Sequence, residues 1–435
     1  MVSGGYGSMT VIATSLELNT EDRRKQKSAR RGWTVVMAAF TVGFALTGST
    51  YSFSAFFADL QGHFQASRGA VSQIFAIVLC VFHLVGAVSG PLADRWGPRG
   101  PALFGAAAVG AGFIFASLST VLWHLYLAFG LIGIGIGFAY VPSIAAVQRW
   151  FIQQRGFASG VAVSGIGLGT LIMPLAATFF ITWFGWRGAF VTLGLFAFVL
   201  GGIAALFVYG APERYGMLPD GGTSNSNEVA RPSEGATLAE AVRSRTFWLL
   251  YVAIFLVAAA QFIPFVHLVV YAEDQGISHG MAVFIFGMVG IGSTVGRLVL
   301  GRFADKYGRR RSLVSLYLGV TLTLIWWFGA TSTWQLVIFA LAFGTCYGGL
   351  VALTPSVIVD YFGSRNASGI IGVLYLALAM ATLIGPRLAG DAFDLFHNYK
   401  LPIALSAVAS FLAAVIVVFL PEPQAAKSTQ IAGKK

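Results

Sequence analysis

Twelve runs of predominantly apolar residues constrain the fold of this chain more than any other feature. A run of about 20 apolar residues is long enough to cross a bilayer as one α-helix. The runs form two sets of six, and a polar segment at 210–245 separates the sets. They lie near 33–57, 70–92, 101–119, 125–147, 156–181, 189–209, 247–271, 281–303, 313–330, 335–359, 367–389 and 401–420. The sequence therefore predicts an all-α membrane protein with twelve transmembrane helices in two six-helix halves.

The composition supports this class and argues against several others. Charged residues make up 10% of the chain, whereas a soluble domain carries about 25%. Both cysteines, Cys80 and Cys346, lie within apolar runs and give neither a disulfide framework nor a metal-ligand spacing. The chain contains no phosphate-binding loop motif and no H-E-x-x-H pair. We therefore predict a protein that is neither an enzyme nor ATP-driven, with no cofactor and no metal.

The distribution of lysine and arginine predicts the topology, because cytoplasmic loops of membrane proteins carry an excess of both residues. With the N-terminus inside, the outer side holds Arg68, Arg187, Arg387 and Lys400, and the other cations of the loops and tails face the cytoplasm. The net charge of +11 then faces anionic lipid headgroups, and nucleic acid is not expected as a partner. The predicted domains are a cytoplasmic tail (1–31), a six-helix half (32–209), a cytoplasmic linker (210–245), a second half (246–420) and a cytoplasmic C-terminal tail (421–435).

An internal repeat relates the two halves. The turn GPLADRWGPR at 90–99 recurs as GRFADKYGRR at 301–310, an offset of 211 residues. The stretch at 149–160, RWFIQQRGFASG, is paralleled by DYFGSRNASG at 360–369. Transporters built from two such halves hold their substrate between the halves, near the middle of the membrane.

The twin turns resemble the signature loop of the major facilitator superfamily, over nearly the whole chain. Four stretches are similar to the monocarboxylate transporter group and its bacterial relatives of the oxalate/formate antiporter type. They are RGWTVV at 31–36, RWFIQQRGFASGVAVSG at 149–165, PFVHL at 264–268, and Arg297 with Gly301 four residues later. The resemblance implies a carrier for a small monocarboxylate. It would lie in the plasma membrane, which in bacteria is the inner membrane.

Arg297 is the sharpest candidate for a binding residue. It lies two turns before Asp305, about 12 Å into the eighth predicted helix. A charge at the centre of a bilayer costs at least about 2.5 kcal/mol, and no acidic residue lies in the middle of a predicted helix. The missing counter-charge is most simply the carboxylate of the substrate, which a guanidinium binds through two parallel hydrogen bonds. The resemblance implies the same role. Alternatively, Arg297 reaches the cytoplasmic surface or packs against backbone carbonyls.

Three departures from the family bear on the substrate. Animal monocarboxylate carriers have an aspartate one turn before this arginine, where this chain has Ser293, and a lysine in the first helix, where it has Ala55. Oxalate antiporters have a second cation in the eleventh helix, where the matching stretch around Leu378 is uncharged. One buried cation suits one carboxylate, which favours a monoanion such as lactate or pyruvate.

Without that aspartate, proton coupling needs another group that titrates. Histidine titrates near neutral pH, and His267, in the outer part of the seventh helix, is the candidate for both proton coupling and substrate binding. The alternative is a histidine hydrogen-bonded between helices. Tyr51, Tyr140, Tyr347 and Tyr375 are candidate cavity residues, because a phenol offers an apolar wall and a hydrogen-bond donor. Their alternative is ordinary helix packing.

The charged residues of the twin turns are candidates for gating. A charge network between the turns could hold the two halves together in one state, although the same residues also serve topology and helix capping. They are Asp94, Arg95, Arg99, Asp305, Lys306, Arg309 and Arg310.

These features predict a secondary transporter that moves a lactate-like monocarboxylate by alternating access, together with a proton. Its partners are then the monocarboxylate anion, the proton and membrane lipid. One alternative is an organic-anion exchanger without proton coupling, because a loaded Arg297 needs no titrating residue. A second alternative is a carrier-like carboxylate sensor, although such proteins usually carry a long soluble extension.

Overall fold

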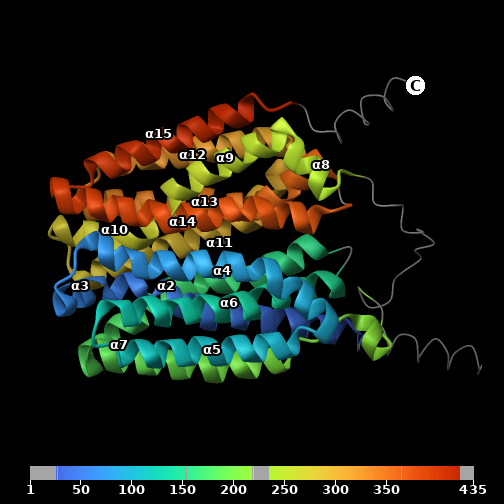
Figure 1. The fold of residues 1–435 in the computed structure, drawn as a ribbon, viewed down its shortest axis with the longest axis horizontal. Helices are drawn as coiled ribbons and strands as arrows, with labels where there is room; N and C mark the ends of the chain where they lie inside the picture. Colours follow the sequence, from blue (N-terminus) through green and yellow to red (C-terminus); the bar gives the residue numbers. More distant parts are fainter. Residues whose placement is uncertain are drawn as a thin grey trace, which may run out of the picture.

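The helices of this protein lie side by side in one elongated bundle (Figure 1). The computed structural model describes residues 26, 28–151, 154–217, 219, 235–363 and 365–421. Nearly all of these residues are helical, and no strand occurs within them. The predicted N-terminal tail to residue 25, the centre of the predicted linker and the predicted C-terminal tail after residue 421 lie outside the described residues.

Eleven helices in the described ranges are long and apolar enough to cross a membrane. They are the span Ser28–Phe64, which contains η1 (Gly43–Thr47), α2 (Gly48–Tyr51) and α3 (Phe53–Phe64), then α4 (Arg68–Trp96), α5 (Arg99–Ser117), α6 (Leu122–Trp150), α7 (Arg155–Leu206), α9 (Arg245–Gln261) continued by α10 (Ile263–Asp274), α11 (His279–Tyr307), α12 (Arg309–Gly329), α13 (Thr333–Phe362), α14 (Ala367–Phe396) and α15 (Lys400–Val418). Two short helices, η2 (Pro212–Tyr215) and α8 (Leu238–Arg243), belong to the predicted linker.

The helix α7 accounts for two of the predicted spans. Its 52 residues are about 78 Å of helix, more than twice the apolar thickness of a bilayer. One residue within it, Gly185, leaves helical geometry with φ 65° and ψ 171°, and the chain kinks there. The predicted interruption at 182–188 is therefore a single-residue kink, and the described chain makes the twelve crossings that the sequence predicts.

The internal repeat has a counterpart in the backbone. Gly97 ends α4 and Gly308 ends α11, both with left-handed φ angles of 86° and 91°. Glycine adopts such angles without the steric strain of a side chain. The first helix of each half is also interrupted near its middle, at Ser52 before α3 and at Phe262 before α10. The second break precedes Pro264, which has no N–H to continue the hydrogen-bond ladder of α9.

Two helix pairs join the halves that the sequence predicts. The helix α4 packs along α14, and α7 packs along α11. Figure 1 shows α4 and α14 next to each other across the middle of the bundle. The other large contacts lie within one set of helices, as between α5 and α6 or between α12 and α15.

Small residues bring α11 unusually close to α13. A Cβ added at Gly296 would lie 2.0 Å from the carbonyl oxygen of Thr345, and one added at Gly348 would lie 2.0 Å from that of Ser293. Close approach of this kind is what small residues allow between membrane helices. On α11, Gly290 meets α7 and Gly296 meets α13, so the face between them, with Arg297, is turned toward the centre of the bundle.

The seam between α11 and α13 gives a stability prediction. Gly296→Ala places a methyl group against the backbone of α13, and overpacking of this kind costs about 1–3 kcal/mol. We expect a lower unfolding temperature for the purified protein. Gly202→Ala is the matched control, because a Cβ there meets nothing within 4 Å and alanine favours helix over glycine. An equal effect of both substitutions would contradict the close packing at Gly296.

Candidate functional site

Arg297 is buried in the middle of the bundle and pairs with no acidic side chain among the described residues. Only 8% of the residue is exposed. Its Nη1 donates a hydrogen bond of 3.1 Å to the carbonyl oxygen of Val163 on α7, and its Nε is buried with no hydrogen-bond partner. In the part of the chain that the structure describes, no carboxylate forms an ion pair with it. The backbone-carbonyl alternative therefore accounts for one N–H group and leaves the charge unbalanced.

Three of the four candidate tyrosines interact with this arginine, and the fourth, Tyr375, interacts with two of the three. The hydroxyl groups of Tyr51 and Tyr347 interact with each other, and both interact electrostatically with Arg297. Tyr140 interacts with Arg297 and with Tyr347, and Tyr375 interacts with Tyr140 and Tyr347. The helices that supply them are α2, α6, α13 and α14, so both halves contribute. We call Arg297 and these four tyrosines the central cluster.

Ser293 lies one helical turn before Arg297 on the same side of α11. It is 3% exposed, and its hydroxyl oxygen has no hydrogen-bond partner. A buried hydroxyl without a partner costs free energy that a bound polar group would recover. Ser293 and Arg297 therefore both present unused hydrogen-bonding capacity near the central cluster.

Aromatic rings form a layer beside the central cluster. The ring centroid of Phe265 on α10 lies 5.2 Å from that of Tyr51 and 4.9 Å from that of Tyr347. Tyr51 also contacts Phe75 of α4 at 5.6 Å. The ring of Phe265 is 3% exposed. This layer connects the two halves and separates Arg297 from the bundle end at which α3 and α10 terminate, which we call the outer end after the predicted topology.

His267 belongs to a different cluster, closer to the outer end. Its Nδ1 lies 2.9 Å from the hydroxyl oxygen of Tyr399, and its Nε2 lies 2.9 Å from the carbonyl oxygen of Pro386 and 3.1 Å from the hydroxyl oxygen of Ser72. The side chain is fully buried. The structure thus does not bring His267 to the central cluster, and it shows the interhelical hydrogen bonds of the alternative interpretation.

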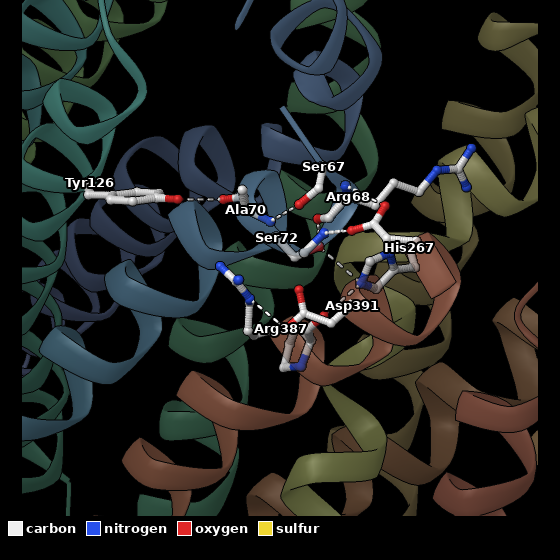
Figure 2. Close-up of polar contacts among 11 residues, drawn as sticks. Ser67, Arg68, Ala70, Ser72, Tyr126, His267, Arg387 and Asp391 are labelled. Carbon is white, nitrogen blue, oxygen red and sulfur yellow. Dashed lines mark hydrogen bonds and ion pairs between the residues drawn. The ribbon is translucent and has the colours of Figure 1, made fainter. Parts of the chain in front are cut away.

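Arg68 joins the two halves next to His267. Its guanidinium donates two hydrogen bonds to Asp274, of 2.6 Å and 2.7 Å, and one of 3.0 Å to the hydroxyl of Tyr399. The backbone N–H groups of Arg68 and Gly69 donate to the carboxylate of Asp394 at 2.9 Å and 3.0 Å. Figure 2 shows Arg68 and Ser72 on one helix facing His267 and the helix that carries Arg387 and Asp391.

The predicted gating residues take up separate positions at the opposite end. Arg309 forms an ion pair of 2.8 Å with Asp360, and Arg310 donates to the carbonyl oxygens of Val417 and Val418, so these partners belong to the same set of helices as the two arginines. The Arg99 guanidinium lies 5.3 Å from the ring centroid of Tyr209, and Lys306 lies 5.4 Å from that of Tyr307.

Three further residues of the twin turns complete this group. Arg95 is exposed. The side chains of Asp94 and Asp305 lie outside the described residues.

Comparison with known proteins agrees with this architecture. The profile of the Major Facilitator Superfamily matches residues 38–324 and 284–435. The chain belongs to the major facilitator superfamily. It is thus a multi-pass membrane transporter and not an enzyme, as the sequence predicts, and the superfamily fold is confirmed.

Similar proteins from this superfamily are animal monocarboxylate transporters. The chain is 27% identical over 419 residues to monocarboxylate transporter 12-B of Danio rerio, covering 89% of this chain and 86% of that protein. It is 27% identical over 395 residues to monocarboxylate transporter 13 of Rattus norvegicus (90% and 89%) and over 400 residues to monocarboxylate transporter 11 of Homo sapiens (90% and 83%). These relatives give no support to the predicted bacterial group.

Sequence reasoning missed Phe265 and the partners of Arg68. Phe265 lies inside the stretch PFVHL, but only His267 of that stretch was predicted as a functional residue. The pairing of Arg68 with Asp274 has no signal in spacing, because 206 residues separate them and both lie at helix ends. Charged residues are ordinary near the ends of membrane-spanning helices, so nothing in the sequence distinguishes these two.

The unbalanced charge of Arg297 gives a second prediction. Replacing a buried, incompletely paired charge by an apolar residue of similar length removes the cost of burying that charge, which is at least about 2.5 kcal/mol in the middle of a membrane. We therefore expect Arg297→Met to raise the unfolding temperature of the purified transporter in the absence of any organic anion. Arg243→Met, at an exposed position on α8, is the control and should leave it unchanged. A lower unfolding temperature for Arg297→Met would mean that Arg297 has a partner.

Proposed function

We propose that this transporter carries a small monocarboxylate, such as lactate or pyruvate, and that Arg297 binds its carboxylate. The observation that carries the proposal is the buried guanidinium of Arg297, whose Nε has no partner and which pairs with no described carboxylate. A carboxylate accepts two parallel hydrogen bonds from a guanidinium and supplies the missing charge. The names of the animal relatives point to the same class of substrate.

The surroundings of Arg297 suit a small organic anion. The Val163 carbonyl fixes one Nη1–H and so orients the guanidinium plane. The phenol groups of the central cluster offer hydrogen bonds to carboxylate oxygens and apolar surface to the rest of the substrate. Arg297 is the one cation of this cluster, and a dianion would leave a second negative charge buried without a partner. The site therefore favours a monoanion.

Alternating access follows from the placement of the cluster between the halves. The tyrosines come from both sets of helices, so substrate bound there contacts both sets at once. With the carboxylate bound, the net charge of the site is close to zero, and moving the halves past one another no longer transports an unbalanced buried charge. The residues of the twin turns would hold the halves together at the opposite end when the outer end opens.

The orientation and the coupling complete the proposal. We place the protein in the plasma membrane with both termini in the cytoplasm, following the distribution of its cations. The proposed domains are the two six-helix halves, 32–209 and 246–420, with the linker 210–245 between them. Transport is coupled to a proton, and His267 is the candidate for carrying it.

A second candidate function is exchange of one organic anion for another. The observation in its favour is the position of His267, which lies in the outer cluster and not beside Arg297. An exchanger needs no titrating group at the binding site, because substrate alone neutralises Arg297. In that case uptake requires a carboxylate on the other side of the membrane and no proton gradient.

Uptake of labelled lactate into proteoliposomes tests the proposal. We expect an inward proton gradient to stimulate uptake, and Arg297→Ala to lower it at least tenfold, since the loss of a charge-assisted hydrogen bond costs about 1.5–3 kcal/mol. Arg243→Ala, which removes an exposed arginine of α8, should transport normally.

The possible outcomes separate the two functions. Uptake that occurs only into vesicles preloaded with a carboxylate would replace the symporter by the exchanger. Lactate uptake that persists in Arg297→Ala would refute the assignment of Arg297. A transporter that moves no member of a panel of monocarboxylates would refute the substrate class.

A further inference from the structure

A polar network closes the outer end between the two halves. Arg68 of α4 binds Asp274 of α10 with both terminal nitrogens and also binds the hydroxyl of Tyr399, just before α15. Its guanidinium carbon lies 3.7 Å from the ring centroid of Phe393 on α14. The carboxylate of Asp394 on α14 receives the first two N–H groups of α4. We call these contacts the Arg68 latch, and all of them break when α4 separates from α10, α14 and Tyr399.

The hydrogen bonds around His267 are complete only when its imidazole is neutral. Nε2–H donates to the carbonyl oxygen of Pro386, and Nδ1 accepts from the hydroxyl of Tyr399. That hydroxyl oxygen in turn accepts from Nη1 of Arg68. Ser72 donates its own hydroxyl to the carbonyl oxygen of Arg68, so it is not needed as a donor to the imidazole. The chain of donors thus runs from Arg68 through Tyr399 and His267 to Pro386.

A proton on His267 would break this chain at Tyr399. Nδ1–H would become a donor, so the phenol oxygen would face two donors, from His267 and from Arg68, and its own hydrogen would lose its acceptor. A second positive charge would also appear beside the Arg68 guanidinium in a fully buried position. Burial of a charge without a direct counter-ion is costly. The closed latch therefore disfavours the protonated imidazole.

The charged groups around His267 do not reverse this conclusion. On α4 the neighbouring charge is Arg68, and on α10 the carboxylate of Asp274 is already paired with Arg68. On α14, Asp391 pairs with Arg387, whereas Asp394 accepts from two neutral backbone N–H groups, keeps its charge and offsets only part of the cost of a second positive charge. The helix α3 presents the ring of Phe57, while its Asp59 interacts with His279 and Glu273.

We propose that protonation of His267 releases the Arg68 latch and opens the outer end of this transporter. Opening exposes the imidazole to water, and by linkage whatever binds the open state better favours that state. A low pH outside the cell would then open the transporter toward the outside, where both the proton and the substrate are taken up. The inference deepens the proton coupling proposed above and rests on it for its link to transport, whereas the latch itself is tested without substrate.

The test is a distance measurement between spin labels on the full chain in lipid nanodiscs. Labels are placed by Gly62→Cys on α3 and Gly280→Cys on α11, one in each half, where a side chain meets no other atom. Cys80→Ser and Cys346→Ala remove the native thiols. Gly62→Cys with Thr120→Cys is a control pair within the first half. Distances are compared between about pH 8 and about pH 5, on either side of the ordinary titration of histidine.

We expect acid to increase the population with a long distance between Gly62 and Gly280 and to leave the control pair unchanged. Arg68→Ala should raise the long-distance population about tenfold already at the higher pH, in line with the loss of a charge-assisted bond. Arg68→Lys keeps the charge but loses the two parallel hydrogen bonds, so it should give a smaller rise. This conservative variant tests the latch even if the alanine variant fails to fold.

The two outer histidines provide the matched comparison. His267→Gln keeps a donor and an acceptor but cannot be charged, so it should fold and lose the response to acid. His279→Gln, which removes the histidine paired with Glu273, should keep that response. A response that survives in His267→Gln, a response lost in His279→Gln, no response in the parent protein, or unchanged distances in Arg68→Ala would each overturn the proposal. None of these outcomes depends on whether Arg297 binds a carboxylate.

Discussion

The structure is constrained above all by a positive charge in an apolar interior, which pairs with no negative charge among the described residues. Arg297 is 8% exposed and has one hydrogen bond to a backbone carbonyl. Such a charge is expensive in a membrane protein, and its position depends on the fold around it. Glycines at the seams of α11 with α7 and α13 allow the neighbouring backbones to come close, and the remaining face of α11 is directed inward. The close seams on either side of α11 therefore fix the position of this charge inside the bundle.

The two polar clusters divide the functions that a transporter must combine. The central cluster contains the cation and the phenol groups, with aromatic rings between it and the outer end. The Arg68 latch contains an ion pair between the two halves, and the buried His267 lies beside it. Mutations in the central cluster can thus change substrate binding, and mutations in the Arg68 latch can change closure of the outer end. Both processes depend on the same movement of α4 against α14.

The sequence was sufficient for the fold class and gave Arg297 and the four tyrosines as candidates, but it did not indicate the latch. A lone arginine in a long apolar run, such as Arg297, is visible without knowledge of its neighbours. Twelve crossings were predictable from run lengths, and the gap between two runs at 182–188 marked the place of the kink, but its restriction to the single residue Gly185 was not predictable. The contacts of Arg68 reach 206 and 331 residues along the chain. Only the packing of α4 against α10 and α14 brings those partners together, and periodicity carries no such information.

The carbonyl of Val163 has a consequence for an unloaded carrier. A neutral acceptor fixes the direction of an N–H group but cancels none of its charge, so Arg297 is oriented in advance while its electrostatic attraction for an anion stays intact. In the proposed mechanism, the empty protein must therefore carry a full buried charge through any change of state, and the loaded protein does not. Slippage without cargo is then opposed by electrostatics built into the centre of the bundle, and no separate lid is required to prevent it.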